Sequence, residues 1–427
     1  MIEIATIKLW SQPVGVVSWD ANKGIGVFEF YPRFKKSGLD VSPFMMPISS
    51  RTNTFSFPDL RDTSFQGLPG LLADSLPDRF GNELINSWLL SKGRPEGSLN
   101  PVEKLCFIGT RSIGAMEFEP ATPKQNDKSK LLEIDSMISL VSEIMLHKRT
   151  LKANLKNQKG ALKNILQVGT SAGGQRAKAI IAYNTKAGDV RSGHGTIPKG
   201  FEHYILKFDG VKDKVLGSSG GWGKVEMAYH KMALAAGIDM MPSLLIHENK
   251  RAHFITKRFD RVGANGKLHA QTFGALKHHD YNNPTRYSYE DLFATTIQLG
   301  CRDHLPQLFR RMVFNVLSMN CDDHVKNFSF LMDRAGNWSL SPAYDICHSY
   351  NPNSPWTSQH NLSVGGKRAK INVSDLKKFA DSFRINKTDV IIDDVSRVVK
   401  NWESFAQEQK VATPIMKDIK RTLGLVV

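Results

Sequence analysis

The stretch that decides the fold is NCDDHVKN, residues 320–327. Before it, apolar side chains recur at helical spacing over 308–319, which predicts a helix with one buried face. After it, residues 328–332 and 338–340 have the composition of two strands, and a turn containing Gly336 separates them. The sequence therefore predicts a polar loop held between a buried helix and a hairpin.

This loop has the residue order that phosphoryl transfer requires. A carboxylate at the end of a helix, here Asp322, can accept the proton of an attacking hydroxyl, and an asparagine five residues later, Asn327, can bind Mg²⁺. Asp345, which follows the hairpin, can hold the metal against the phosphates. Protein kinases have the same Asp-to-Asn spacing in their catalytic loop, whereas the spacing from Asp323 to Asn327 does not match. The alternative is a polar turn in which Asp322 or Asp323 caps a helix.

The same region also allows a metal-site interpretation. Cys301 and His304 have the Cys-x-x-His spacing that Cys321 and His324 repeat, and four such ligands could bind zinc if they converged. The apolar helix expected over 306–319 would hold the two pairs about 20 Å apart at 1.5 Å per residue. Zinc is therefore the less favoured interpretation.

A glycine-rich loop over 169–178 is a candidate phosphate site. The apolar residues 165–168 before it and 179–183 after it are expected to be strands, and glycines in such a turn let backbone amides approach phosphate oxygens. Hydroxyls and positive charges in the same loop come from Thr170, Ser171, Arg176 and Lys178.

A second glycine-rich stretch, 217–225, resembles a Walker A loop only in part. Ser218 stands where the first glycine is required, and Val225 replaces the Ser or Thr that binds Mg²⁺. We expect a flexible loop there.

Lys207 lies within the apolar segment 204–208, which is expected to be a strand. A lysine in such a segment either faces solvent or has an anionic partner, and a nucleotide phosphate would serve as that partner. Glu226, on a helix predicted over 224–236, could orient this lysine as a helix glutamate does in kinases. The alternative for Glu226 is a glutamate favoured by the helix dipole. Residues 254–261 lie between the strand-rich and helix-rich parts, where a segment joining two kinase lobes must lie.

Composition limits the class of protein. The chain has 427 residues, and 57 Lys and Arg against 41 Asp and Glu give a net charge of +16, which favours a polyanionic partner. No apolar run approaches the ~18 residues that cross a bilayer, and the N-terminus lacks the features of a signal peptide. The four scattered cysteines are typical of reduced thiols, so we expect a cytoplasmic protein without a membrane partner.

The amino-acid composition changes along the chain in a way that predicts three structural units. Strands expected near 4–9, 14–19 and 25–31 precede a helix over 79–90. A polar linker over 120–130 leads to a helix over 131–145 and then to a basic stretch over 148–163, which is either a solvated amphipathic helix or a phosphate-backbone contact. We predict a strand-rich unit at 1–120, the remainder of an N-lobe at 121–256 and a helical C-lobe at 257–427.

Taken together, the chain resembles the HipA family of toxin serine/threonine kinases. The resemblance rests on several motifs in fixed order over most of the length. They are GLLADSLPD at 70–78, the glycine loop, ILK at 205–207, RFDR at 258–261, the Asp-x-His-x-Lys-Asn loop and Tyr344-Asp345. It implies an α+β, two-lobed fold distantly like a protein kinase, with a strand-rich N-terminal region and a mainly helical C-terminal lobe.

The resemblance also implies roles for individual residues. Asp322 resembles the catalytic aspartate, with Asn327 and Asp345 as Mg²⁺ ligands and Lys207 on the ATP phosphates. Other residues implied in ATP binding are Gly173, Gly174, Gln175 and Lys178 in the glycine loop, Lys257 and Phe259 through their backbones, Asp260 on the ribose, and His324 and Lys326 at the phosphates. Members can phosphorylate a serine in the glycine loop; here Thr170 and Ser171 occupy that place, which leaves the site of autophosphorylation open.

The family also implies partners. Members pair with a helix-turn-helix antitoxin, HipB in the type case, which binds operator DNA, and known substrates include aminoacyl-tRNA synthetases, especially glutamyl-tRNA synthetase. The segment Asp345-Ile346-Cys347 departs from the Asp-Phe-Gly of ordinary kinases. Two alternatives stay open: a small-molecule kinase on the same scaffold, and a DNA-binding co-repressor subunit without kinase activity, which the net charge and the basic stretch 148–163 motivate.

Overall fold

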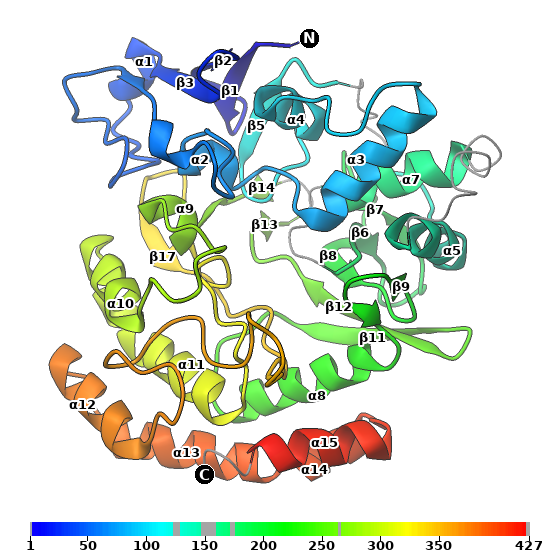
Figure 1. Cartoon of the computed structure of the whole chain (residues 1–427), viewed down its shortest axis with the longest axis vertical. Coiled ribbons are helices and arrows are strands. Elements are labelled where there is room, and N and C mark those ends of the chain that lie inside the picture. Colours follow the sequence, from blue (N-terminus) through cyan, green and yellow to red (C-terminus); the bar gives the residue numbers. More distant parts are fainter. Residues whose placement is uncertain (1, 123–128, 147–158, 171–175, 264–265, 424–427) are drawn as a thin grey trace.

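The computed structural model describes residues 2–122, 129–146, 159–170, 176–263 and 266–423. Figure 1 shows an N-terminal sheet at one end of the molecule and the last helices of the chain at the opposite end, with a second sheet between them. Strands dominate the first part and helices the last. This arrangement confirms the predicted α+β class.

The N-terminal sheet is antiparallel with the order β4-β3-β2-β1-β5. Its first three strands were predicted from sequence, and its edge strand β5 returns from residue 116 to pair with β1. Hydrophobic side chains of the sheet form a core that also contains α2 and α4. The strands are β1 (Ile4–Leu9), β2 (Gln12–Asp20), β3 (Ile25–Phe30), β4 (Thr54–Phe55) and β5 (Met116–Glu119).

Two of the N-terminal helices pack against different sheets. Helix α4 (Pro101–Ile108) begins with a capping box of Asn100 and Glu103 and packs on the N-terminal sheet. Helix α3 (Arg79–Ser91) begins at the cap Asp78, and its buried face joins the core of the second sheet. The residues before 120 therefore contribute to two hydrophobic cores. The short elements in this part are α1 (Pro32–Lys35), η1 (Pro58–Leu60) and α2 (Gly70–Ala73).

The second sheet is antiparallel with the order β11-β12-β8-β6-β7. Helices α3, α5 (Ile134–Met145) and α7 (Lys159–Gly169) share its core, and α8 (Trp222–Ala235) packs beside β12 and β11. The strands are β6 (Lys178–Tyr183), β7 (Val190–Ser192), β8 (Glu202–Lys207), β11 (Ser243–Glu248) and β12 (Arg251–Lys257).

Two predictions in this region were wrong. Residues 165–168 were expected to be a strand, but they form the last turns of α7. Leu162, Ile165 and Leu166 are buried at helical spacing, and a mainly apolar run of four residues cannot by itself distinguish a buried strand from a helix. The stretch 217–225, expected to be a flexible loop, contains strand β10 and the first turn of α8 instead.

The C-terminal part is mainly helical around one core. The predicted helix before the polar loop is α11, and the predicted hairpin is β16 and β17, paired with β15 in a three-stranded sheet. The helices are α9 (Phe273–Lys277), α10 (Tyr289–Gln298), α11 (Leu305–Leu317), α12 (Val373–Phe383), α13 (Thr388–Lys400), α14 (Trp402–Glu408) and α15 (Thr413–Leu423), with η2 at Arg302–His304. The strands are β15 (His269–Thr272), β16 (Ser329–Met332) and β17 (Trp338–Leu340).

Two pairs of very short strands complete the secondary structure of the described residues. They are β9 (Lys212–Asp213) with β10 (Gly217–Ser218), and β13 (Arg261–Val262) with β14 (Gly266–Lys267). Within the described ranges, none of the helices has the length and apolar character that a bilayer crossing requires.

Candidate active site

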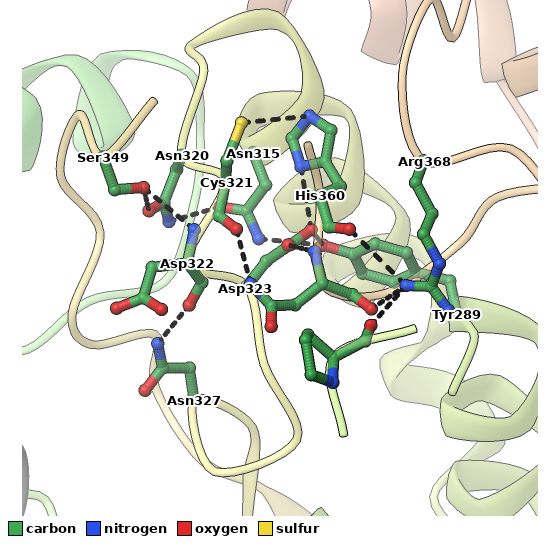
Figure 2. A network of polar contacts seen from close by, with 12 residues as sticks. Tyr289, Asn315, Asn320, Cys321, Asp322, Asp323, Asn327, Ser349, His360 and Arg368 are labelled. Carbon is green, nitrogen blue, oxygen red and sulfur yellow. Dashed lines mark hydrogen bonds and ion pairs between the residues drawn. The ribbon is translucent and has the colours of Figure 1, made fainter. Parts of the chain in front are cut away.

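The loop at 320–327 closes on itself through hydrogen bonds. The side-chain Nδ2 of Asn327 donates to the carbonyl oxygen of Asp322 at 2.6 Å (Figure 2). The backbone amide of Asn327 donates to the carbonyl of His324 at 2.8 Å. The amide of Asp322 donates to the Ser349 hydroxyl at 2.9 Å. These bonds fix the backbone on both sides of the Asp322 carboxylate. Because Nδ2 is used in the bond to the Asp322 carbonyl, Oδ1 is the side-chain atom of Asn327 that remains for a metal ion or a hydrogen-bond donor.

The two adjacent aspartates of this loop have different surroundings. The side chain of Asp323 is fully buried; it accepts hydrogen bonds from the Tyr289 hydroxyl at 2.8 Å and the Asn361 amide at 2.7 Å, and it contacts His360 at 3.1 Å. Half of the Asp322 side chain is exposed. Asp323 is therefore a structural acceptor, whereas the Asp322 carboxylate is open to solvent.

Electrostatic surroundings also separate the two positions. Desolvation raises the pKa of Asp322, and His324 partly offsets this while the carboxylate of Asp345 adds to it. Burial lowers the pKa of His360, but the adjacent Asp323 carboxylate overcomes that effect and raises it to about 10. His360 and Asp323 thus form a buried ion pair at neutral pH. A raised pKa suits Asp322 to accepting a proton.

Lys207, at the end of β8, forms ion pairs with two carboxylates, Glu226 on α8 and Asp345. The contact with Glu226 confirms the orienting interaction that was one of the two interpretations of that glutamate. Against the cost of desolvation, Lys207 and the nearby Lys178 hold the pKa of Asp345 well below its usual range. We call Lys207, Glu226 and Asp345 the lysine cluster.

The residues around Asp345 bring it to the loop. Asp345 has a positive φ of 53°, and the hydroxyl of the preceding Tyr344 donates to the Lys326 carbonyl at 2.8 Å. The segment carrying Asp345 is thereby attached one residue from Asn327. A carboxylate and an amide oxygen are hard oxygen donors, and such a small protein contribution is typical of Mg²⁺ sites completed by phosphate oxygens and water. Asn327 and Asp345 therefore fit Mg²⁺.

Three further residues were predicted at the phosphate site: Lys178, His324 and Lys326. Lys178 begins β6 in register with Lys207 on β8, and its side chain is buried. The Lys326 ammonium lies 5.3 Å from the centre of the Tyr281 ring, and the His324 ring is 5.8 Å from the same ring. The charge of Lys178 lowers the pKa of Asp345 and partly offsets the rise in the pKa of Asp322, whereas the charge of Lys326 acts on Asp74 and Asp78.

The segment 257–261, which we call the hinge segment, joins the second sheet to the helical part. Lys257 pairs with Glu202, its amide donates to the Pro242 carbonyl at 2.9 Å, and Phe259 lies 5.4 Å from the Tyr344 ring. This position is compatible with the predicted backbone contacts to adenine, which stay a prediction.

Asp260 does not fit its predicted contact with ribose. The side chain is 2% exposed, and its two oxygens accept from Arg258 and from Arg261 at 2.6 Å and from the Gly114 amide at 2.6 Å. A sugar hydroxyl could reach this carboxylate only by breaking a buried ion pair. We call Arg258, Asp260 and Arg261 the arginine cluster, and its aspartate is structural.

The glycine loop can be followed only in part. Ser171, Gly173, Gly174 and Gln175, together with most of the basic stretch 148–163, lie outside the described residues. Thr170 is 1% exposed, and its hydroxyl donates to the Leu166 carbonyl at 2.9 Å. In this conformation Thr170 is therefore closed to a phosphoryl donor.

The cysteines of the zinc interpretation have other contacts. Cys321 Sγ lies 3.9 Å from Nε2 of His360, and Cys301 Sγ contacts the Leu299 carbonyl at the opposite end of α11. Sequence reasoning missed Ser349, which positions Asp322, and it named Tyr344 beside Asp345 without assigning the positioning role that the structure shows. Their only signal is proximity to Asp345 in the chain, because serine and tyrosine are common in loops.

Two family models match the chain, one along each part. Residues 5–119 match the HipA N-terminal domain, and residues 170–402 match the HipA-like C-terminal domain. The second match alone covers more than half of the chain. Among solved structures, Shewanella oneidensis HipA, determined with HipB and its operator DNA, superposes with a TM-score of 0.67 over 98% of this chain and 95% of that chain. At 17% sequence identity, this likeness shows the fold.

Curated relatives match over shorter lengths. A protein of Sinorhizobium fredii named "Putative kinase Y4dM" is 27% identical over 39% of this chain and 41% of its own length. A second protein of that organism, with the same designation and the symbol Y4mE, is 26% identical over 46% of this chain and 42% of its own length. The chain thus spans about two fifths of the length of these relatives.

Proposed function

Because the chain belongs to the HipA family, we propose that it is an ATP- and Mg²⁺-dependent serine/threonine protein kinase and the toxin of a toxin–antitoxin pair. The observation that carries this proposal is the meeting of two groups. The lysine cluster comes from the second sheet, α8 and the segment after β17, and the Asp322–Asn327 loop follows α11. Tyr344 joins them through its bond to the Lys326 carbonyl.

The proposed step is attack of a protein hydroxyl on the γ-phosphorus of ATP. Asp322 accepts the hydroxyl proton as the new O–P bond forms, and the bond from the γ-phosphorus to the β,γ-bridging oxygen breaks, leaving ADP. Lys207 exchanges its contact with Asp345 for a phosphate oxygen while Glu226 keeps the ammonium in place. Lys178 and Lys326 add positive charge where the transition state is negative.

Magnesium, when bound by Asn327 and Asp345, would neutralise phosphate charge at the reacting centre. The bond from Asn327 Nδ2 to the Asp322 carbonyl turns the amide oxygen away from the loop backbone. The loop geometry that positions the base thus also sets the orientation of a metal ligand.

Labelled ATP tests the proposal with purified protein, Mg²⁺ and a generic acceptor such as casein. Wild type should transfer label to protein, and Asp322→Asn should reduce the rate by about 10²–10³-fold. The matched control is Asp303→Asn, an exposed aspartate in η2. Equal transfer by wild type and Asp322→Asn would refute the assignment. Label that appears only on small metabolites would support the small-molecule kinase instead.

The physiological substrate belongs to the same proposal. An aminoacyl-tRNA synthetase, in the first place glutamyl-tRNA synthetase, is the acceptor that family membership favours. Incubation of the kinase and ATP with purified synthetases, followed by mass spectrometry, should identify a phosphorylated serine or threonine. Unmodified synthetases beside a labelled generic acceptor would exclude this substrate and retain the kinase.

Autophosphorylation is a further part of the proposal, at Ser171 or Thr170. Because Thr170 is buried and bonded to Leu166, its modification requires the end of α7 to open first, whereas Ser171 is one residue farther along. We expect phosphate on Ser171 after incubation with ATP and its loss in Ser171→Ala. Phosphate on Thr170 in the Ser171→Ala variant would assign the site to the threonine.

We also propose a helix-turn-helix antitoxin as partner and, through it, operator DNA. The support is the Shewanella oneidensis neighbour, which was determined with HipB and operator DNA, and the net charge of +16. Co-expression with a helix-turn-helix protein encoded beside this chain should yield a complex that retards operator DNA. DNA binding by the kinase alone, with the same affinity and salt dependence as the complex, would favour the co-repressor alternative.

A further inference from the structure

The segment 111–114 of the N-terminal part contacts two elements that border the proposed nucleotide site. On one side it reaches the C-terminal end of α7, which leads into the glycine loop. On the other it reaches the hinge segment. We call residues 111–114, which lie between α4 and β5, the linking segment.

Arg111 binds the end of α7. Its guanidinium Nη1 donates to the carbonyl of Leu166 at 2.9 Å and to that of Gln167 at 3.2 Å, and the rest of the group donates to Phe107 and Ile108 of α4. The last carbonyls of a helix lack partners within the helix and carry partial negative charge. A buried guanidinium from another part of the chain therefore caps α7.

Arg111 and Thr170 share a hydrogen-bond acceptor. The hydroxyl of Thr170 donates to the same Leu166 carbonyl that accepts from Arg111. Helix α3 closes the other side, because a Cβ at Gly81 would lie 2.8 Å from the Thr170 carbonyl oxygen. The backbone of Leu166–Thr170 is thus enclosed by residues of α3 and by Arg111.

Gly114 binds the hinge segment. Its amide donates to Asp260 at 2.6 Å, and its carbonyl accepts from Arg261 at 3.0 Å, while the Ser112 carbonyl accepts from Arg261 at 3.3 Å. Gly114 has φ +77°, and a Cβ there would lie 2.7 Å from the amide nitrogen of Ala270 on β15. A side chain is therefore excluded, and the backbone itself makes the contacts.

We propose that the linking segment positions the nucleotide site: Arg111 holds the end of α7, Gly114 holds the hinge segment, and the short segment of four residues that contains both fixes the distance between these two borders. The inference rests on the proposed ATP-dependent function. Arg111 and Gly114 are positioning residues, since their contacts are with α4, α7, β15 and the arginine cluster. ATP affinity should then depend on residues that the nucleotide does not touch.

Full-length Arg111→Met tests this, with Mg²⁺ and a non-hydrolysable ATP analogue in a calorimetric titration. Loss of the charge-assisted bonds should weaken binding about tenfold, and Arg111→Lys should recover part of the loss. The matched control is Leu89→Ala, which removes a fully buried side chain from the far end of α3 in the same core. It should lower the unfolding temperature and leave nucleotide affinity within about twofold of wild type.

Hydrogen exchange supplies a second measurement that needs no nucleotide. Amides of 162–170 should exchange faster in Arg111→Met and Arg111→Lys and at the wild-type rate in Leu89→Ala. Unchanged affinity and unchanged exchange in both Arg111 variants would overturn the inference, and if Arg111→Met does not fold, Arg111→Lys decides it alone. Failure of the wild-type protein to bind the analogue would instead refute the proposed function. The exchange data would still test whether Arg111 holds the end of α7.

Discussion

The lysine cluster and the arginine cluster are both groups of three charged residues beside the proposed nucleotide site, yet their surroundings differ. Side chains of the lysine cluster are 12–32% exposed, and Lys207 is shared between two carboxylates. Side chains of the arginine cluster are 1–8% exposed, and Asp260 also accepts a backbone amide. The first cluster can exchange partners with a ligand, whereas the second can do so only by exposing a buried ion pair. What separates a binding residue from a structural one here is less its charge than how exposed its side chain is and whether protein groups already occupy its hydrogen-bonding positions.

The largest effect is expected in the arginine cluster. Asp260→Ala leaves two buried guanidinium groups without their carboxylate and should lower the free energy of unfolding by about 3–5 kcal/mol. Urea unfolding measures this. The control is Asp62→Ala, which removes the exposed partner of the exposed Arg61 and should change stability by less than about 1 kcal/mol. A stable Asp260→Ala with weakened ATP binding would break the comparison and restore the ribose contact.

The lysine cluster should show the opposite effect. Lys207→Met should reduce phosphate transfer by about 10²–10³-fold while the protein remains folded, because the charge that meets the phosphates is lost. Transfer assays and thermal unfolding are compared on the same samples. Lys8→Met is the matched control: Lys8 also lies in a strand, is 24% exposed and pairs with Glu119 at 2.6 Å. Near-normal phosphate transfer by Lys207→Met would contradict the assignment of the lysine cluster to phosphate binding.

The buried pair of Asp323 and His360 gives a pH-dependent prediction. Asp323 raises the pKa of His360 to about 10, while an unfolded histidine titrates near 6.5. The folded protein then holds an extra proton between these values. Stabilisation by this pair is complete below pH 6.5 and is lost as the pH rises toward 10, with a slope of up to about 1.4 kcal/mol per pH unit. His360→Gln should flatten this part of the stability curve, and an unchanged slope would contradict the assignment.

The smallest effect concerns Ser349. Ser349→Ala removes the hydroxyl that accepts from the Asp322 amide, so the catalytic loop should lose one hydrogen bond worth about 0.5–1.5 kcal/mol. We expect kcat to fall by about threefold to tenfold with little change in the KM for ATP. Ser354→Ala, which removes a hydroxyl that accepts from the exposed Trp356 amide, is the control. A large rise in KM would place Ser349 at the nucleotide instead.

Local patterns predicted much of this architecture. Strands β1 to β3 were predicted from their composition and the turns between them, and the helix and hairpin around Asp322 from 3.6-residue periodicity and a glycine turn. The end of α7 was assigned wrongly because the run 165–168, which has three apolar residues and Gln167, is too short to carry a period of its own. Helix α3 was placed correctly in sequence, but the core it joins depends on tertiary packing that periodicity does not encode.

The candidate site shows the same limit. The spacing from Asp322 to Asn327 is local, and the loop indeed closes over that interval. Asp260 was assigned to ribose because RFDR stands where a hinge should lie, but its saturation depends on Gly114, which is 146 residues away. Ser349 was missed for a related reason, since its bond to the Asp322 amide spans 27 residues.

The bond from Gly114 to Asp260 also has a consequence for the order of folding. During synthesis, the N-terminal sheet and the linking segment leave the ribosome before the hinge segment exists. Domains generally fold as units in order of emergence, so the surface that will receive Asp260 and Arg261 is formed first. The hinge segment then docks onto a template that was synthesised earlier, and its contacts must offset the entropy of closing a loop of 146 residues. A chain begun at residue 120 would have to form its hinge without that template.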